Sequence, residues 1–188
     1  LYTAHLVNGI GNLISRVSAM VQQYFQGTIT RPADALLVSV PFKTDIDVLA
    51  APGRDLKIVS VASDRFIREE TMPRYTAALG EYRLDGALQE VMRLFRMLDR
   101  YIQDYEPYKL VKTDQEQVQA ILWNLVSSIH SASLLLPPFM PNTAKSIARV
   151  LGVEPDETEE AIRARTAYTV TKKDALFPRI EKPKTSHV

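Results

Sequence analysis

Residues 114–136, "DQEQVQAILWNLVSSIHSASLLL", decide the fold of this chain. Apolar residues recur there at spacings of three and four, as on an α-helix, and Asp114 stands where an N-cap is expected. The apolar positions are Val118, Ile121, Leu122, Leu125, Val126, Ile129 and Leu136. Because apolar side chains occur on nearly every side, the pattern predicts a buried helix at the centre of a bundle.

Amphipathic helices are predicted on both sides of this segment. A long helix should run from Leu84 until Pro107 ends it. After Pro137 and Pro138 a further helix should close at Gly152, which has the position of a C′ glycine. A short acidic helix, roughly residues 155–165, should follow. The predicted fold class is therefore mainly α, an antiparallel helical bundle with short connections.

Residues 1–25 should form another helix with one buried face. Its apolar positions are Leu6, Ile10, Leu13, Ile14, Val17, Met20, Val21 and Tyr24. Asn8, Asn12 and Arg16 form an i, i+4, i+8 stripe directed away from that face. Two glycines within "NGIGNLISR" (8–16) each cost about 0.8 to 1 kcal/mol of helix stability relative to Ala. The stretch therefore suggests that something other than helix stability is needed there.

The helical pattern of apolar residues is interrupted at residues 31–62. Two β-branched runs, 36–40 and 56–61, alternate with prolines and a glycine, so that either a short hairpin or a loop with one helical turn is possible. Helical texture resumes near Asp64, with Pro73 as a kink or boundary. We expect a single domain over 1–188 with 31–62 as an insertion and 166–188 as a tail that packs on the bundle or leaves it.

Composition excludes several classes of protein. The 188 residues are 46% hydrophobic and 24% charged, with a net charge of +1 and no cysteine, which fits a globular protein and excludes disulfides and thiolate metal sites. With only three scattered histidines, no metal is predicted. No apolar run is long enough for a membrane span and no secretory leader opens the chain, so we expect a cytoplasmic protein without a membrane partner. The start at Leu1, inside a helical pattern, suggests a fragment of a longer chain.

Residues 104–112, "DYEPYKLVK", place a proline and an aromatic residue at the end of the long helix. With Lys109 and Lys112 beside it, Tyr108 could offer a flat face with positive charge around it, the means by which proteins hold an unstacked RNA base. The alternative is a helix stop with the Tyr108 ring packed against the bundle. Phosphate-binding, hydrolase and metalloprotease motifs are absent.

Four motifs resemble the anticodon-binding domain of the methionyl-tRNA synthetase family. "GNLISR" (11–16) is similar to that family's Gly-Asn-Leu-x-x-Arg, and "YIQDYEPYKLVKTD" (101–114) to its Asp-Glu-x-x-Pro-Trp-Lys-Leu element. "LLLPPFMPNTAKSI" (134–147) resembles Ala-Pro-Phe-Met-Pro, and "LFPRIE" (176–181) resembles Leu-Phe-Pro-Arg-Ile. The motifs keep the family's order and span nearly the whole chain, apart from about 31–80.

The resemblance implies a helical bundle that reads the CAU anticodon of tRNA(Met). The family's aromatic residue stacks on the first base, cytosine, while Asn and Arg form hydrogen bonds around it. The positions that carry or flank these roles here are Asn8, Asn12, Arg16, Pro107, Tyr108 and Lys109. Small glycines beside Asn12 would let a nucleotide approach the backbone closely.

The resemblance also implies a longer enzyme that uses ATP and Mg²⁺ to attach methionine to its tRNA. The family's His-Ile-Gly-His and Lys-Met-Ser-Lys-Ser signatures do not occur in these residues, so we expect the fragment to be inactive alone and to hold no cofactor. Its expected partners are the tRNA(Met) anticodon stem-loop and its own catalytic domain.

Three positions depart from the family pattern. Tyr108 stands where Trp is usual, Gln103 where Asp is common, and Pro137 where Ala is usual. Two other interpretations remain open at this stage: the anticodon-binding domain of a sister synthetase for isoleucine, valine, leucine or cysteine, and a helical protein-interaction scaffold, which the near-zero net charge favours.

Overall fold

A computed structural model describes residues 9–45, 58–61 and 63–171 of the chain. Asn8 and the "LFPRIE" motif lie outside the described residues. The described elements are, in chain order, α1 (Asn12–Phe25), β1 (Thr28–Thr30), α2 (Asp34–Ser39), β2 (Phe42–Asp45), β3 (Ile58–Val61), α3 (Ser63–Phe66), the π-helix η3 (Ile67–Thr71), α4 (Met72–Gly80), α5 (Leu84–Tyr105), α6 (Pro107–Leu110), α7 (Gln115–Leu134), α8 (Pro141–Leu151), α9 (Glu159–Ala164) and β4 (Ala167–Thr169).

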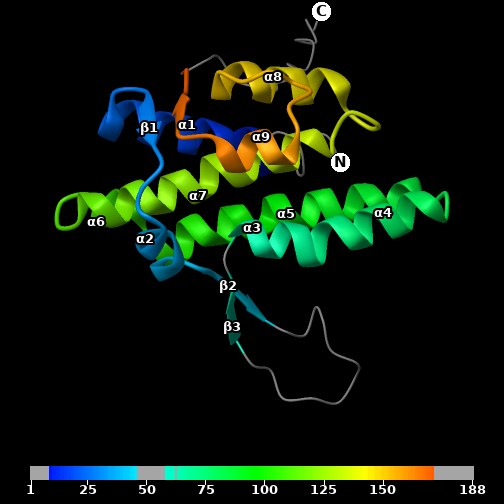
Figure 1. The fold of residues 1–188 in the computed structure, drawn as a ribbon, viewed down its shortest axis with the longest axis horizontal. Helices are drawn as coiled ribbons and strands as arrows, with labels where there is room; N and C mark the ends of the chain where they lie inside the picture. Colours follow the sequence, from blue (N-terminus) through cyan, green and yellow to red (C-terminus); the bar gives the residue numbers. More distant parts are fainter. Residues whose placement is uncertain (1–8, 46–57, 62, 172–188) are drawn as a thin grey trace, which may run out of the picture.

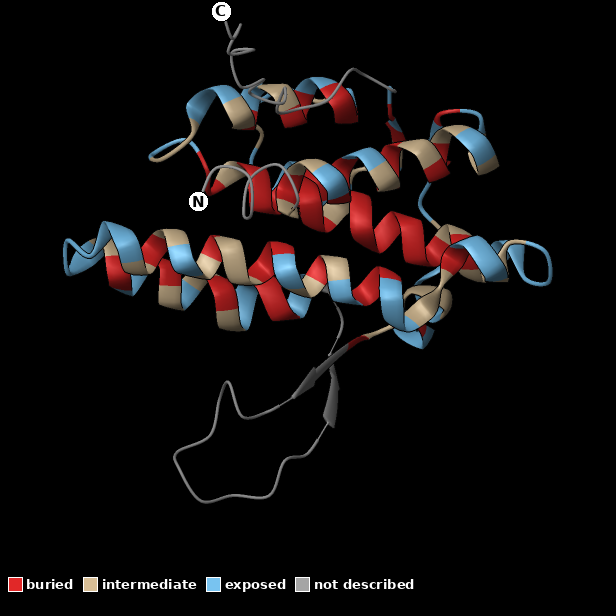
Figure 2. Cartoon of the chain, turned by 180° about the vertical axis from the view of Figure 1, so that it is seen from behind, coloured by how far each residue is buried: buried red, intermediate tan, exposed pale blue. Residues whose placement is uncertain are grey.

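Helix α7 is the centre of the bundle, as its sequence predicts. It contacts α1, α2, α5, α6, α8 and α9, and Figure 1 shows it passing between α8 on one side and the α4–α5 pair on the other. Figure 2 shows that the buried residues gather on the surfaces that these helices turn toward one another. Asp114 is its N-cap, because its carboxylate accepts a hydrogen bond from the backbone N–H of Gln117 at 2.9 Å.

The boundaries of the neighbouring helices follow local chemistry. Helix α5 ends at Tyr105, two residues before Pro107, and α8 closes on Gly152, whose φ of 66° is left-handed. A Cβ at Gly152 would lie 2.4 Å from the backbone oxygen of Thr169, so glycine is required there for close packing as well as for conformation. Pro73 lies in the first turn of α4, directly after the π-helix. Proline is well tolerated in the first turn of an α-helix because it has no N–H to satisfy there, and the change of helix type falls at this boundary.

The 31–62 segment contains both structures that its sequence left open. β2 pairs with β3 in antiparallel register, with Phe42 opposite Val61, whereas the β-branched run at 36–40 lies mainly in the short helix α2. Tertiary contacts decide this, because the backbone oxygen of Val40 accepts hydrogen bonds from the Tyr101 hydroxyl at 2.7 Å and from the Asn124 amide at 3.3 Å. The end of α2 is thereby attached to α5 and α7.

The last described residues pack on the bundle through a two-stranded sheet. β4 pairs antiparallel with β1, with Tyr168 opposite Ile29, and both side chains are buried. The backbone N–H of Arg31 extends the pairing to the oxygen of Thr166 at 2.8 Å. Among the described helices, none combines the length and the apolar composition that crossing a bilayer requires.

Candidate nucleic-acid interface

The turn between α5 and α6 directs one aromatic side chain outward. Glu106 adopts a left-handed conformation (φ 45°, ψ 54°) that ends α5, and Pro107 then starts α6 with its own side chain buried. Proline suits the first turn of a helix because it has no N–H to satisfy there. The next side chain, Tyr108, is 46% exposed. Its ring therefore lies at the surface and is not packed into the core.

Glu106 holds Tyr108 and Lys109 together at this corner. Oε1 of Glu106 accepts a hydrogen bond from the Tyr108 hydroxyl at 2.9 Å and lies 2.7 Å from Nζ of Lys109. The ammonium lies 6.0 Å from the centroid of the Tyr108 ring. The hydrogen bonds from Lys109 and then from Tyr108 lower the pKa of the Glu106 carboxyl below its usual value. The three side chains form an ordered, exposed cluster.

Helix α1 presents the second half of the candidate interface. Leu13, Ile14 and Val17 are buried against the bundle, which leaves Asn12 exposed and Arg16 half-buried on the opposite face. Nη1 of Arg16 forms an ion pair with Oδ1 of Asp99 on α5 at 2.8 Å. The other carboxylate oxygen of Asp99 accepts a hydrogen bond from the Gln103 amide at 3.0 Å.

The structure ties Arg16 of α1 to α5, the helix that ends just before Tyr108, although the two residues are far apart in the sequence. The pKa of the Tyr108 hydroxyl is raised, mainly by its hydrogen bond to Glu106, and the positive charge of Arg16 acts on this hydroxyl in the opposite direction. Asn12 is exposed one turn before Arg16 on the same face of α1.

Gly9, at the beginning of the described chain, faces open space. A Cβ built on it would meet no atom within 4 Å, so packing within the described residues does not require glycine there.

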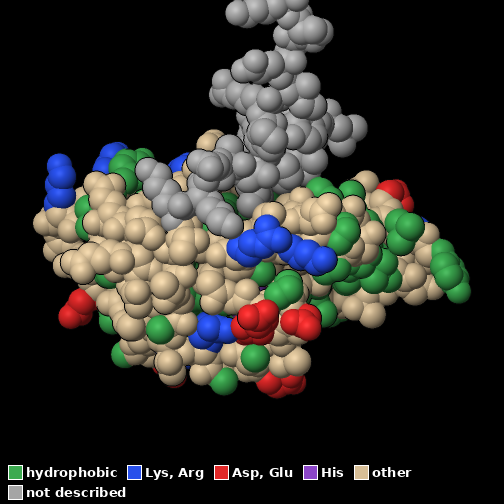
Figure 3. All heavy atoms as spheres, turned by 90° about the horizontal axis from the view of Figure 1, so that it is seen from above, with side chains coloured by type: hydrophobic (Ala, Val, Ile, Leu, Met, Phe, Trp, Pro, Cys, Tyr) green, Lys and Arg blue, Asp and Glu red, His purple; other side chains and the backbone are tan. Residues whose placement is uncertain are grey.

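The interface has little unbalanced charge. Arg16 is paired with Asp99 and Lys109 with Glu106, while Lys112 is exposed and forms no ion pair among the described residues. On the face shown in Figure 3, basic and acidic side chains likewise lie near one another and do not form one broad field. This surface therefore carries no strong long-range field that would attract a polyanion.

Sequence reasoning missed Asp99 and noted Gln103 only as a departure from the family pattern. Their spacing of four residues on α5 indicates that they share a helix face. No local pattern indicates that Arg16, 83 positions away along the chain, pairs with Asp99. That contact depends on how α1 packs against α5.

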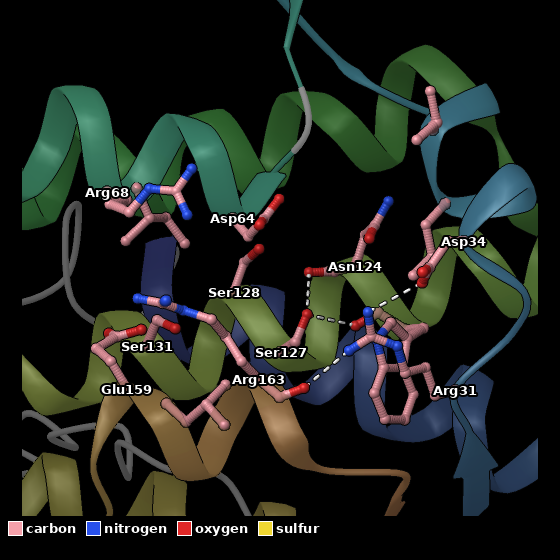
Figure 4. A pocket seen from close by; sticks show the side chains of 15 residues that line it. Arg31, Asp34, Asp64, Arg68, Asn124, Ser127, Ser128, Ser131, Glu159 and Arg163 are labelled. Atoms are coloured by element: carbon pink, nitrogen blue, oxygen red, sulfur yellow. Dashed lines mark hydrogen bonds and ion pairs between the residues drawn. The ribbon is translucent and has the colours of Figure 1, made fainter.

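A separate pocket of about 400 Å³ lies between α2, α3, η3, α7 and α9. It is lined by three arginines (Arg31, Arg68, Arg163) and three carboxylates (Asp34, Asp64, Glu159), and no pocket residue belongs to the Tyr108 cluster. Figure 4 shows these side chains around a floor of serines on α7. Because the opposite charges are equal in number, the pocket has no excess of positive charge to attract a polyanion.

Two polar side chains of α7 form hydrogen bonds within the bundle. The Ser127 hydroxyl donates to the backbone oxygen of Trp123 at 2.9 Å, and Nδ1 of buried His130 lies 3.2 Å from the Tyr168 hydroxyl. No group of three or more His, Cys, Asp or Glu residues within 9–45, 58–61 and 63–171 could hold a metal ion.

Comparisons with known proteins point to one family. The family model described as "Anticodon binding domain of methionyl tRNA ligase" matches residues 64–187. A methionine–tRNA ligase of Clostridium acetobutylicum is 29% identical over 182 residues, and one of Streptomyces coelicolor is 31% identical over 194 residues. These alignments cover 94% and 96% of this chain but only 25% and 32% of the relatives. The chain thus spans about a quarter to a third of the length of these relatives.

A solved structure supports the fold. The crystal structure of Mycobacterium tuberculosis methionyl-tRNA synthetase bound by methionyl-adenylate has a TM-score of 0.70 to this chain at 20% sequence identity. The match covers 94% of this chain and 32% of that one. At this level of identity the likeness concerns the arrangement of helices.

Proposed function

Because the chain belongs to the family of anticodon-binding domains of methionyl-tRNA ligases, we propose that it reads the CAU anticodon of tRNA(Met). The observation that carries the proposal is the exposed Tyr108 ring at the end of α5, the same helix whose Asp99 forms an ion pair with Arg16 of α1. An aromatic face beside hydrogen-bonding side chains suits a base that is turned out of its stack.

Each side chain of this surface has a proposed role. Tyr108 stacks on the first anticodon base, and buried Pro107 fixes the backbone from which the ring projects. The Asn12 amide both donates and accepts hydrogen bonds, so it can match a base edge. Arg16 uses the N–H groups that Asp99 leaves free to bind the base or a phosphate.

Flanking residues extend the proposed contact. Lys109, beside the ring, and Lys112 are both exposed and would bind phosphates that flank the stacked base. Asn8 continues the Asn12 and Arg16 stripe by sequence spacing, and its role remains a proposal outside the described residues.

The chemistry of the longer enzyme is part of the proposal. We propose that the chain is the recognition part of a cytoplasmic ligase that attaches methionine to tRNA(Met), with ATP and Mg²⁺ used by a catalytic domain that these residues do not include. The described residues offer no metal-binding cluster, and the chain contains none of the family's catalytic signatures.

The proposal is tested by titrating the chain with two anticodon stem-loops that differ only in the first base, CAU and UAU. Anisotropy of a labelled RNA measures both affinities. We expect tighter binding of CAU, and equal affinity for the two loops would refute anticodon reading. A protein-interaction scaffold would bind neither loop, whereas the proposed contact should bind CAU and weaken as salt rises.

A further inference from the structure

The ion pair between Arg16 on α1 and Asp99 on α5 involves a residue, Asp99, that lies outside the aromatic cluster. We propose that Asp99 is a positioning residue for anticodon recognition: its carboxylate fixes the orientation of the Arg16 guanidinium so that Arg16 reads the first base. This inference rests on the proposed function and concerns the same surface. It predicts that the preference for cytosine at that position depends on a side chain that does not contact the RNA.

Both oxygens of the Asp99 carboxylate are engaged. Oδ1 lies 2.8 Å from Nη1 of Arg16 and Oδ2 accepts a hydrogen bond from Gln103 at 3.0 Å. Gln103 lies one turn after Asp99 on α5, so it fixes the carboxylate from the same helix. The carboxylate is thereby held in one orientation and presents its other oxygen to α1.

Arg16 keeps N–H donors available for a ligand after it has paired with Asp99. A guanidinium carries five N–H donors in a rigid plane, and the described residues give Arg16 no partner other than Asp99. Holding one edge of the plane fixes the direction of the remaining donors. An unheld arginine at this surface could reach many phosphates, and ordering it on binding would cost side-chain entropy.

Fold stability is a weak reason for this ion pair. The side chains of Arg16 and Asp99 are 36% and 38% exposed, and pairs with that exposure contribute about 0 to 1 kcal/mol. The carboxylate also places negative charge beside a surface proposed to bind a polyanion. A simple charge argument therefore predicts that neutralising Asp99 tightens RNA binding, whereas the positioning role predicts the opposite.

Because the charge argument and the positioning role predict opposite changes in RNA affinity, the Asp99→Asn variant distinguishes them. It keeps the size of the side chain and removes its charge. We expect affinity for the CAU stem-loop to fall about 3- to 10-fold, while affinity for the UAU stem-loop changes little, so that the preference for CAU falls. In an Arg16→Ala background the same substitution should have no effect, because the residue to be positioned is absent.

Asp104→Asn is the matched control. Asp104 lies on the same helix and pairs with Arg100 at 3.9 Å, so its neutralisation changes the net charge by the same amount. We expect it to leave the preference for CAU unchanged. Thermal unfolding followed by circular dichroism verifies that each variant is folded at the temperature of the titration.

A second variant keeps the inference testable if Asp99→Asn does not fold. Arg16→Lys retains the positive charge but removes the planar fork, so we expect affinity for UAU to be retained while the preference for CAU falls. An unchanged preference would overturn the inference, as would tighter or unaltered CAU binding by Asp99→Asn. If the unmodified chain does not prefer CAU, the proposed function itself fails, which distinguishes the two results.

Discussion

Tyr108→Ala is the substitution that best separates RNA binding from folding. The ring is 46% exposed, and its hydroxyl contacts Glu106 on the same surface turn. It does not belong to the buried core or to the partly buried residues that pack against that core. Removing it should therefore change the free energy of unfolding by no more than about 0.5 kcal/mol.

The expected effect on RNA binding is much larger. Stacking of one base on an aromatic side chain contributes about 1 to 3 kcal/mol, so loss of the ring should raise the dissociation constant for the CAU stem-loop by about 5- to 150-fold. Tyr108→Phe keeps the ring and removes the hydrogen bond to Glu106. Because stacking uses the face of the ring, this variant should retain most of the affinity.

The assay is anisotropy of a labelled CAU stem-loop, with urea unfolding of each variant measured in parallel. Tyr82→Ala is the matched control, because Tyr82 is 92% exposed and lies in the turn that precedes α5. Figure 1 shows this α4–α5 turn at the opposite end of the bundle from α6. Along the 22 residues of α5 the separation is roughly 33 Å, so Tyr82→Ala should leave RNA binding unchanged.

Two results would refute the reasoning. If Tyr108→Ala lowers the free energy of unfolding by 2 kcal/mol or more, on the order of a core truncation, the ring is structural. If it binds CAU as tightly as the unmodified chain does, or if Tyr82→Ala weakens binding equally, stacking on Tyr108 does not occur.

Three further predictions follow from the contacts. Arg16→Ala should leave the free energy of unfolding within about 1 kcal/mol, because its ion pair is partly exposed; a larger loss in urea unfolding would indicate a buried structural role. Asp114→Ala should remove about 1 kcal/mol of stability through loss of the α7 N-cap, measured in the same way, and no change would contradict the capping assignment. Burial lowers the pKa of His130 to about 4, so the unfolded chain binds more protons between about pH 4 and 6.5, and the free energy of unfolding should fall by up to about 3 kcal/mol as pH drops through that range. His130→Gln should reduce this pH dependence, and an unchanged pH profile would mean that His130 is not its source.

Local patterns in the sequence account for most of the fold. The apolar spacing of residues 118–136 requires a helix with little exposed surface, and Asp114 and Gly152 mark helix ends by their own conformational and hydrogen-bonding preferences. The secondary structure of the 31–62 segment could not be predicted from local patterns in the same way. Its run at 36–40 has strand propensity but becomes helical at α2, where Tyr101 and Asn124 bind the oxygen of Val40. Such contacts across the fold override local preference.

The candidate interface, too, could be predicted from the sequence only in part. The sequence by itself determined that Asn12 and Arg16 turn away from the apolar face of α1, and that Pro107 interrupts the chain just before Tyr108, because helical periodicity and proline geometry act over a few residues. Only the tertiary structure decided that Arg16 pairs with Asp99, on the helix that ends just before Tyr108. That outcome depends on the packing of α1 against α5, which the burial of two apolar faces determines and no local pattern of charges encodes.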